Sequence, residues 1–220
     1  MNKFQTSAFA LAALLIASGA QAATAVTSES DPALATAALY DFEAGPTGTW
    51  TSQGFGALTV TALPGVDTAS PVFSVTTDYA GSYNTRGANH ISNLGSQFQS
   101  IKFSFGAPTT AFGFLLGATD STWTLNVYDA GNNLLASENM PAVFGSNAGD
   151  YFGFSGLTGA SYAVATQVQD GIYANGGVDY TFFDNIRVAS TTAVPEPGSL
   201  ALMIAGLALV GRAARRRASV

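Results

Sequence analysis

Residues 100–105 read Ser-Ile-Lys-Phe-Ser-Phe, and residues 122–127 read Thr-Trp-Thr-Leu-Asn-Val. In both stretches apolar side chains alternate with polar ones, which is the period of a strand with one buried face. The phase of the second stretch places Trp123 on the same side as Leu125 and Val127. These stretches therefore predict an all-β protein in which Trp123 is a core residue.

Similar short segments recur between residues 38 and 190, and turn-forming residues separate them. Asp129 to Asn133 predicts a hairpin turn, and Gly106, Pro108 and Thr110 predict another turn before a strand at 112–116. Residues 77–95 are expected to form a loop, and short strands inside this loop are the alternative. Further strands are expected at 39–43, 58–61, 72–76, 134–136, 151–154, 162–168 and 180–188. About ten short strands without helical periodicity predict an antiparallel jelly-roll β-sandwich over residues 38–190.

The N-terminus has the layout of a cleavable signal peptide. Lys3 precedes an apolar run at 9–16, and small residues follow at Ala20 and Ala22. A basic start, a short apolar core and an A-x-A site define such a signal. We expect residues 1–22 to be removed by cleavage after Ala22. Residues 23–37 are small, polar and featureless, and are expected to be a flexible segment.

The C-terminus, residues 194–220, has a three-part layout of its own. Val194, Pro195, Glu196 and Pro197 are followed by an apolar stretch, which predicts a transmembrane helix at about residues 199–211. A basic end follows, formed by Arg212, Arg215, Arg216 and Arg217. Arginines remain on the cytoplasmic side, so the rest of the chain is expected outside.

This tail resembles the PEP-CTERM sorting signal of Gram-negative bacteria that make extracellular polysaccharide. The resemblance implies that an exosortase-type membrane protease-transpeptidase recognises Pro195-Glu196-Pro197 and removes the helix. The protein would cross the inner membrane, remain anchored there until it is processed, and reach the cell surface or extracellular matrix. An ordinary C-terminal anchor is the alternative, since hydropathy alone does not separate the two.

Composition excludes several classes of partner and chemistry. Between residues 23 and 194 only Arg86, Lys102 and Arg187 oppose thirteen acids, a net charge near −10. Such a domain disfavours nucleic acid and anionic lipid, and it is compatible with neutral sugars and divalent cations. The chain contains no cysteine, so thiol catalysis and disulfides are excluded and a hydrophobic core must hold the fold.

The first and last predicted strands of the domain carry acids that suggest a metal site. Residues 39–43 (Leu-Tyr-Asp-Phe-Glu) and 182–188 (Phe-Phe-Asp-Asn-Ile-Arg-Val) are similar to the edges of carbohydrate-binding β-sandwich modules, and this resemblance implies a structural calcium there. Strand phase puts Asp184 on an apolar face with Phe182, Ile186 and Val188, and it puts Asp41 and Glu43 on one face of the first strand. We therefore hypothesise that Asp41, Glu43 and Asp184 bind calcium. A hydrogen bond to Asp184 from the main chain or Arg187 is the alternative.

Catalysis has little support in the sequence. His90 is the only histidine, and no Gly-x-Ser-x-Gly nucleophile motif accompanies it. Carboxylates for glycoside hydrolysis are available, but most sit in turns. Exposed aromatic residues in loops are better candidates, because they can stack on sugars. These candidates are Trp50, Tyr79, Tyr83 and Tyr173, together with Tyr151.

The sequence thus favours an exported, non-catalytic protein of the cell surface or extracellular matrix, with a structural or adhesive role in an exopolysaccharide-rich biofilm. A saccharide-binding module is the alternative, and an extracellular hydrolase comes third. Neither the ligand nor the oligomeric state follows from the sequence.

Overall fold

The computed structural model describes residues 22–65, 70–93, 99–143, 150–169 and 178–190. Over these residues the chain forms thirteen strands and one turn of 3-10 helix, and every strand pair is antiparallel. The elements in chain order are β1 (Thr24–Ala25), η1 (Pro32–Leu34), β2 (Ala38–Tyr40), β3 (Gly48–Trp50), β4 (Ser52–Phe55), β5 (Leu58–Leu63), β6 (Phe73–Thr76), β7 (His90–Ser92), β8 (Ser100–Gly117), β9 (Trp123–Asp129), β10 (Leu134–Met140), β11 (Tyr151–Ser155), β12 (Ala160–Gln167) and β13 (Phe182–Ser190). The predicted all-β antiparallel class is confirmed.

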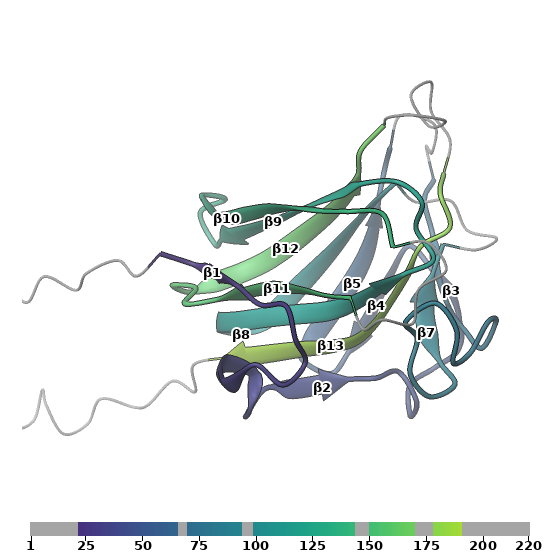
Figure 1. Ribbon diagram of the computed structural model, residues 1–220, viewed down its shortest axis with the longest axis horizontal. Coiled ribbons are helices and arrows are strands. Elements are labelled where there is room, and N and C mark those ends of the chain that lie inside the picture. Colours follow the sequence, from purple (N-terminus) through teal and green to yellow (C-terminus); the bar gives the residue numbers. More distant parts are fainter. Residues whose placement is uncertain (1–21, 66–69, 94–98, 144–149, 170–177, 191–220) are drawn as a thin grey trace, which may run out of the picture.

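The strands form two layers that share β8, which lies between β11 and β13 in Figure 1. The first layer has the order β4-β5-β8-β12-β9-β10 and uses residues 100–105 of β8. The second layer has the order β1-β11-β8-β13 and uses residues 109–117 of β8. Beyond β13 the second layer continues with β2 at one end and with β7, β6 and β3 at the other. β8 therefore joins the two layers covalently.

The predicted turn in the middle of β8 is wrong. Gly106, Pro108 and Thr110 lie inside one continuous strand of 18 residues. Pairing with β5 ends at Phe105, and pairing with β13 begins at Thr109, so the strand changes layers over these positions. Glycine and proline are tolerated there because the chain bends where it leaves one ladder for the next.

Aromatic side chains fill the space between the layers. The ring of Phe103 lies 5.5–5.7 Å from the rings of Phe112, Phe114 and Phe183, between centroids. Trp123 is fully buried and meets Phe183 edge-on at 5.7 Å, so its prediction as a core residue is confirmed. Buried aromatic pairs of this kind stabilise a fold beyond their apolar area, which matters in a chain without disulfides.

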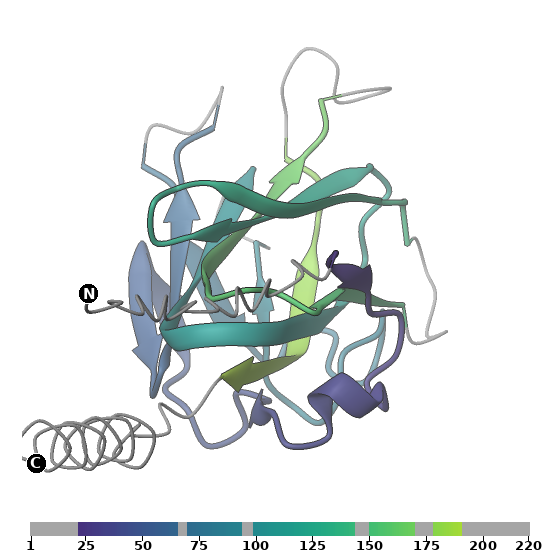
Figure 2. The ribbon, with the colours of Figure 1, turned by 90° about the vertical axis from the view of Figure 1, so that its left-hand side faces the viewer.

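The N-terminal segment differs from the featureless, flexible one expected for residues 23–37. β1 pairs with β11, and η1 is capped by the Asp31 carboxylate, which accepts a hydrogen bond from the Ala33 N–H. Val26 and Leu34 are fully buried against the outer side of the second layer. Figure 2 shows the segment running along the outside of the sandwich. Its two large apolar residues explain the packing, although short polar residues surround them.

The signal peptide and the C-terminal helix fall on residues 1–21 and 191–220, outside the described residues. Among the residues that the structure does describe, no helix has the length and apolar character needed to cross a membrane.

Candidate functional site

A β-bulge in β13 decides which way Asp184 faces. The register between β13 and β8 shifts by one residue just after Asp184, and Asn185 has a φ of 45°. Because a bulge inserts one residue, it reverses the side-chain phase of the strand. Phe183, Ile186 and Val188 lie in the core together. The prediction that Asp184 shares a face with Ile186 and Val188 is therefore wrong, since Asp184 lies on the outer side of the second layer.

Asp184 is buried under a loop and accepts hydrogen bonds from main-chain N–H groups. Its side chain is 1% exposed, and its two oxygens accept from Arg86 N at 2.6 Å and Asn185 N at 2.7 Å. Burial raises the pKa of Asp184 to about 7, and these N–H groups oppose the rise. The negative charges of Glu43 and Asp41 add to the rise, which shows that the three acids are near one another.

Glu43 holds the next part of the same loop. Its Oε1 accepts from Ala88 N at 2.6 Å and from Asn89 N at 2.9 Å. The Asn89 amide donates to the main-chain oxygen of Phe42 at 3.2 Å, and Asp41 accepts from Glu43 N at 3.2 Å. The first and last predicted strands are neighbours, because β2 pairs with β13. Together Glu43 and Asp184 anchor residues 86–89.

The structure thus brings the three predicted metal ligands into one region, where each accepts a main-chain hydrogen bond. Within the described ranges, no group of three or more His, Cys, Asp or Glu side chains is arranged to hold a metal ion. The N–H donors give Asp41, Glu43 and Asp184 a role that needs no cation. Calcium binding at these residues stays a prediction.

The anchored segment, residues 77–89, is named the aromatic loop because it carries Tyr79 and Tyr83. The Tyr79 ring lies nearly parallel to the ring of Phe182, with 6.1 Å between centroids and 28° between planes. Tyr83 meets Tyr79 edge-on at 5.8 Å and Phe182 at 6.1 Å. Phe182 is buried, whereas Tyr79 is 56% exposed. The loop therefore presents one aromatic ring to solvent above a packed aromatic base.

The aromatic loop is held in a strained backbone conformation. Tyr79, Tyr83 and Asn84 have φ values of 62°, 51° and 64°, in the left-handed region that non-glycine residues rarely adopt. The Asn84 amide donates to the main-chain oxygen of Leu116 at 2.9 Å. A Cβ at Gly117 would lie 1.6 Å from the Tyr83 oxygen, so the loop backbone packs directly on β8. Strain of this kind concentrates at functional sites, where surrounding contacts maintain it.

His90 lies beneath the loop, with its ring 4.6 Å from that of Phe182. It is fully buried, and neither of its ring nitrogens has a hydrogen-bond partner among the described residues. Burial lowers the pKa of His90 to about 4, although Asp78 and Glu43 act in the opposite direction. A general base must reach a nucleophile or substrate. His90 is placed as a packing residue and forms no Ser-His-Asp arrangement in this part of the chain.

The other predicted aromatic candidates do not join Tyr79 and Tyr83. Trp50 is half-buried and packs on Phe73, with 6.0 Å between ring centroids. Tyr151 is 2% exposed and belongs to the cluster covered by the N-terminal segment, which excludes it as a platform. Tyr173 lies outside the described residues.

Sequence analysis missed a second aromatic group on the outer face of the first layer. Tyr128 and Tyr162 stack with 5.0 Å between centroids and 18° between planes, and the Lys102 ammonium lies 4.3 Å from the Tyr162 ring. Tyr162 also donates to the Asn132 side chain at 2.9 Å. The strand alternation that identified the core also places these residues outward, so it could have found them. Because Tyr162 is partly buried whereas Tyr79 is exposed, Tyr79 is the better platform.

Comparisons with known proteins address the sorting signal and the fold. Residues 193–217 match the model of the PEP-CTERM protein-sorting motif. No curated protein matches the chain.

Among solved structures, the enzymatically active domain of bacteriophage CBA120 tailspike protein 4 matches with a TM-score of 0.28 and 14% identity. That match covers 66% of this chain and only 19% of the tailspike. TmCBM61 in complex with β-1,4-galactotriose matches with a TM-score of 0.34 and 16% identity, over 68% of this chain and 94% of the module. A family 29 carbohydrate binding module matches with a TM-score of 0.32 and 9% identity, over 80% of this chain and 98% of the module. At these TM-scores no binding residue can be carried over to this chain.

The predicted residues Val194 to Pro197 fall inside the matched motif. The chain carries a PEP-CTERM sorting motif at its C-terminus, which indicates an exported protein.

Proposed function

We propose that the chain is an exported, non-catalytic surface protein that binds neutral saccharide on the aromatic loop. The observation that carries the proposal is Tyr79, an exposed ring stacked on a buried one. Aromatic rings bind the apolar faces of ligands while hydroxyl groups remain free to hydrogen-bond. Because Glu43 and Asp184 anchor the loop, little conformational freedom is lost on binding.

Charge supports a neutral ligand. The domain has a net charge near −10, and the loop carries Asp78 beside Tyr79. Arg86 is the only basic residue between 77 and 89, and its Nε lies 3.8 Å from Glu29 Oε1. An anionic polysaccharide would therefore meet net repulsion at the loop.

The sorting motif supports a location for saccharide binding outside the inner membrane. Processing by an exosortase-type enzyme would release the domain from the inner membrane, and a saccharide-binding loop would retain it in an exopolysaccharide matrix. Intact mass of the protein from its native host tests this step. A mass running from about Ala23 to the Pro195-Glu196-Pro197 motif supports processing, whereas a mass that retains residues 200–220 contradicts it.

Binding to a neutral-glycan array is the direct test of the loop. We expect Tyr79→Ala to reduce binding at least tenfold, whereas Tyr79→Phe, which keeps the ring, should retain it. Leu134→Ala is the matched control, because Leu134 is also 56% exposed and lies in β10. Equal binding by all four proteins would contradict the proposal, and release of sugar from any polysaccharide would overturn its non-catalytic part.

A further inference from the structure

A groove lies at the open side of the sandwich, between β2 with its following loop and the tip of the β4–β5 hairpin. Its cavity volume is about 300 Å³. That volume is at the lower end for small-molecule sites and is sufficient for one sugar ring. The residues used below line it, namely Tyr40, Phe42, Gly45, Pro46, Phe55 and Gly56.

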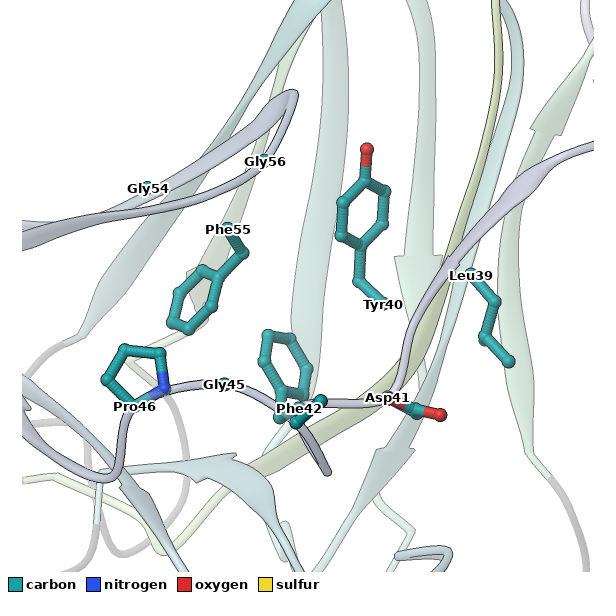
Figure 3. Close-up of a pocket in the computed structure, with 10 residues that line it drawn as sticks. Leu39, Tyr40, Asp41, Phe42, Gly45, Pro46, Gly54, Phe55 and Gly56 are labelled. Atoms are coloured by element: carbon teal, nitrogen blue, oxygen red, sulfur yellow. The ribbon is translucent and has the colours of Figure 1, made fainter.

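Aromatic rings form the floor and two sides of the groove. Phe42 and Phe55 meet edge-on with 5.0 Å between centroids. Figure 3 shows Tyr40 and Phe55 on two sides of the hollow with Phe42 between them, while the Asp41 side chain is directed away from the rings. Tyr40 and Phe55 are only partly buried, so part of each ring remains accessible. Glycines at the rim leave main-chain polar groups uncovered by side chains.

The backbone at Phe42 is strained. Phe42 has a φ of 62°, which is an outlier for so bulky a residue. Its main-chain oxygen accepts hydrogen bonds from Gly45 N at 3.2 Å and from the Asn89 amide at 3.2 Å. These two hydrogen bonds stabilise the strained backbone of Phe42 and thereby the shape of the groove. Strain that neighbouring contacts maintain is typical of ligand sites.

The lining determines which ligand chemistry fits. It contains no lysine, arginine or histidine, and its one ionisable acid is Asp41. Anions are therefore disfavoured, since a negative ligand would meet a negative charge and no cation. Aromatic faces and the Tyr40 hydroxyl suit a neutral ring with one apolar face and several hydroxyl groups.

We propose that this groove binds a single neutral pyranose ring, packed between Tyr40 and Phe55, as a site separate from the aromatic loop. The inference does not depend on Tyr79. It gives the chain two points of contact with saccharide, one on the aromatic loop and one in this groove. A ligand of this size has a dissociation constant on the order of 1 mM.

Saturation-transfer difference NMR with glucose, galactose and mannose as probes tests the groove. The measurement uses a chain with Tyr79→Ala, in which the loop platform is removed, so that binding at Tyr79 does not contribute to the signal. Gly45→Leu is the blocking variant, because a Cβ at Gly45 would lie 3.5 Å from the Phe55 ring and the position needs no left-handed φ. Thr47→Leu is the matched control, since it adds the same side chain at an exposed position outside the lining.

We expect at least one sugar to give a signal that Gly45→Leu abolishes and Thr47→Leu preserves. Tyr40→Phe, which removes only a hydroxyl, should weaken the signal about two- to tenfold, and melting temperatures show that each variant is folded. If none of the three sugars gives a signal in the Tyr79→Ala chain, the proposed site in the groove is contradicted, whatever the aromatic loop binds. A signal that survives Gly45→Leu would overturn it as well.

Discussion

The main-chain N–H of Arg86 donates a hydrogen bond of 2.6 Å to the carboxylate of Asp184, across 98 positions of sequence. The bond ties the aromatic loop to the last strand of the sandwich. We expect Asp184→Ala to lower the free energy of unfolding by about 1–3 kcal/mol, because the main-chain N–H groups of Arg86 and Asn185 lose their acceptor. Asp184→Asn keeps an acceptor and should cost less. Hydrogen exchange of the loop amides checks the mechanism, and unchanged exchange at residues 82–88 in Asp184→Ala would contradict it.

The close packing of the loop on β8 predicts that Gly117 cannot be replaced. A Cβ there would overlap the Tyr83 oxygen, which is a main-chain atom and cannot rotate away. We expect Gly117→Ala to cost about 1–3 kcal/mol of stability and to weaken glycan binding, since it displaces the loop. Gly54→Ala is the control, because nothing lies within 4 Å of its Cβ. Equal melting temperatures for the two variants would show that the loop packs elsewhere.

Stability should be higher in mild acid than at neutral pH. The pKa values of Asp184 and Glu138 are raised to about 7, mainly by burial, so their contribution is full below pH 4 and is lost as the pH rises through 7. His90 acts oppositely, because its pKa is lowered to about 4 and its contribution is lost as the pH falls from 6.5 through 4. Between pH 8 and pH 5 Asp184 contributes a gain of about 2.6 kcal/mol, the part-exposed Glu138 contributes less, and His90 contributes a loss of about 2 kcal/mol. Unfolding should therefore require about 1–3 kcal/mol more at pH 5 than at pH 8.

Urea unfolding at the two pH values measures this difference. Asp184→Asn, which cannot ionise, should remove most or all of it, because Asp184 makes the largest contribution. A protein that is more stable at pH 8 than at pH 5 would refute the assignment of these groups.

Calcium binding at Asp41, Glu43 and Asp184 can be tested at pH 8, where Asp184 is largely ionised. If calcium at ten times its dissociation constant binds only the folded chain, it adds about 1.4 kcal/mol and raises the melting temperature by about 3–6 °C. The rise should vanish in Asp184→Asn. Absence of both calorimetric heat and a melting shift would leave the N–H groups of Arg86, Ala88 and Asn89 as the partners of Asp184 and Glu43.

The N-terminal segment should contribute measurably to stability. Leu34 is fully buried, so Leu34→Ala should cost about 2–5 kcal/mol in urea unfolding. The exposed Thr36, two residues away, is the control, and Thr36→Ala should change little. Equal midpoints for the two variants would mean that residues 23–37 do not pack on the sandwich in solution.

Alternation along the sequence was sufficient for the class of the fold and for the buried Trp123. It failed where a local irregularity changes the phase. The bulge at Asn185 turns Asp184 away from the core face. The residue types around this position do not predict a bulge. The bend in β8 was taken for a turn because the same residues serve both.

The candidate site was predictable only in part. Loop position was enough to nominate Tyr79 and Tyr83, but their stacking on Phe182 depends on the bulge that turns Phe182 outward. The groove at Tyr40 combines residues 39–46 with residues 54–56. Neither segment by itself predicts that the two lie next to each other. Both parts required the tertiary structure.

Because β8 belongs to both layers, the domain should unfold in one cooperative transition. β8 pairs with β5, which precedes it, and with β11, β12 and β13, which follow it. Most of these pairings join distant parts of the chain, and such topologies fold slowly. β13 ends at Ser190, three residues before the sorting motif begins. The last strand of the sandwich therefore lies directly before the sorting motif, so the fold is complete only once almost the whole chain up to that motif is available.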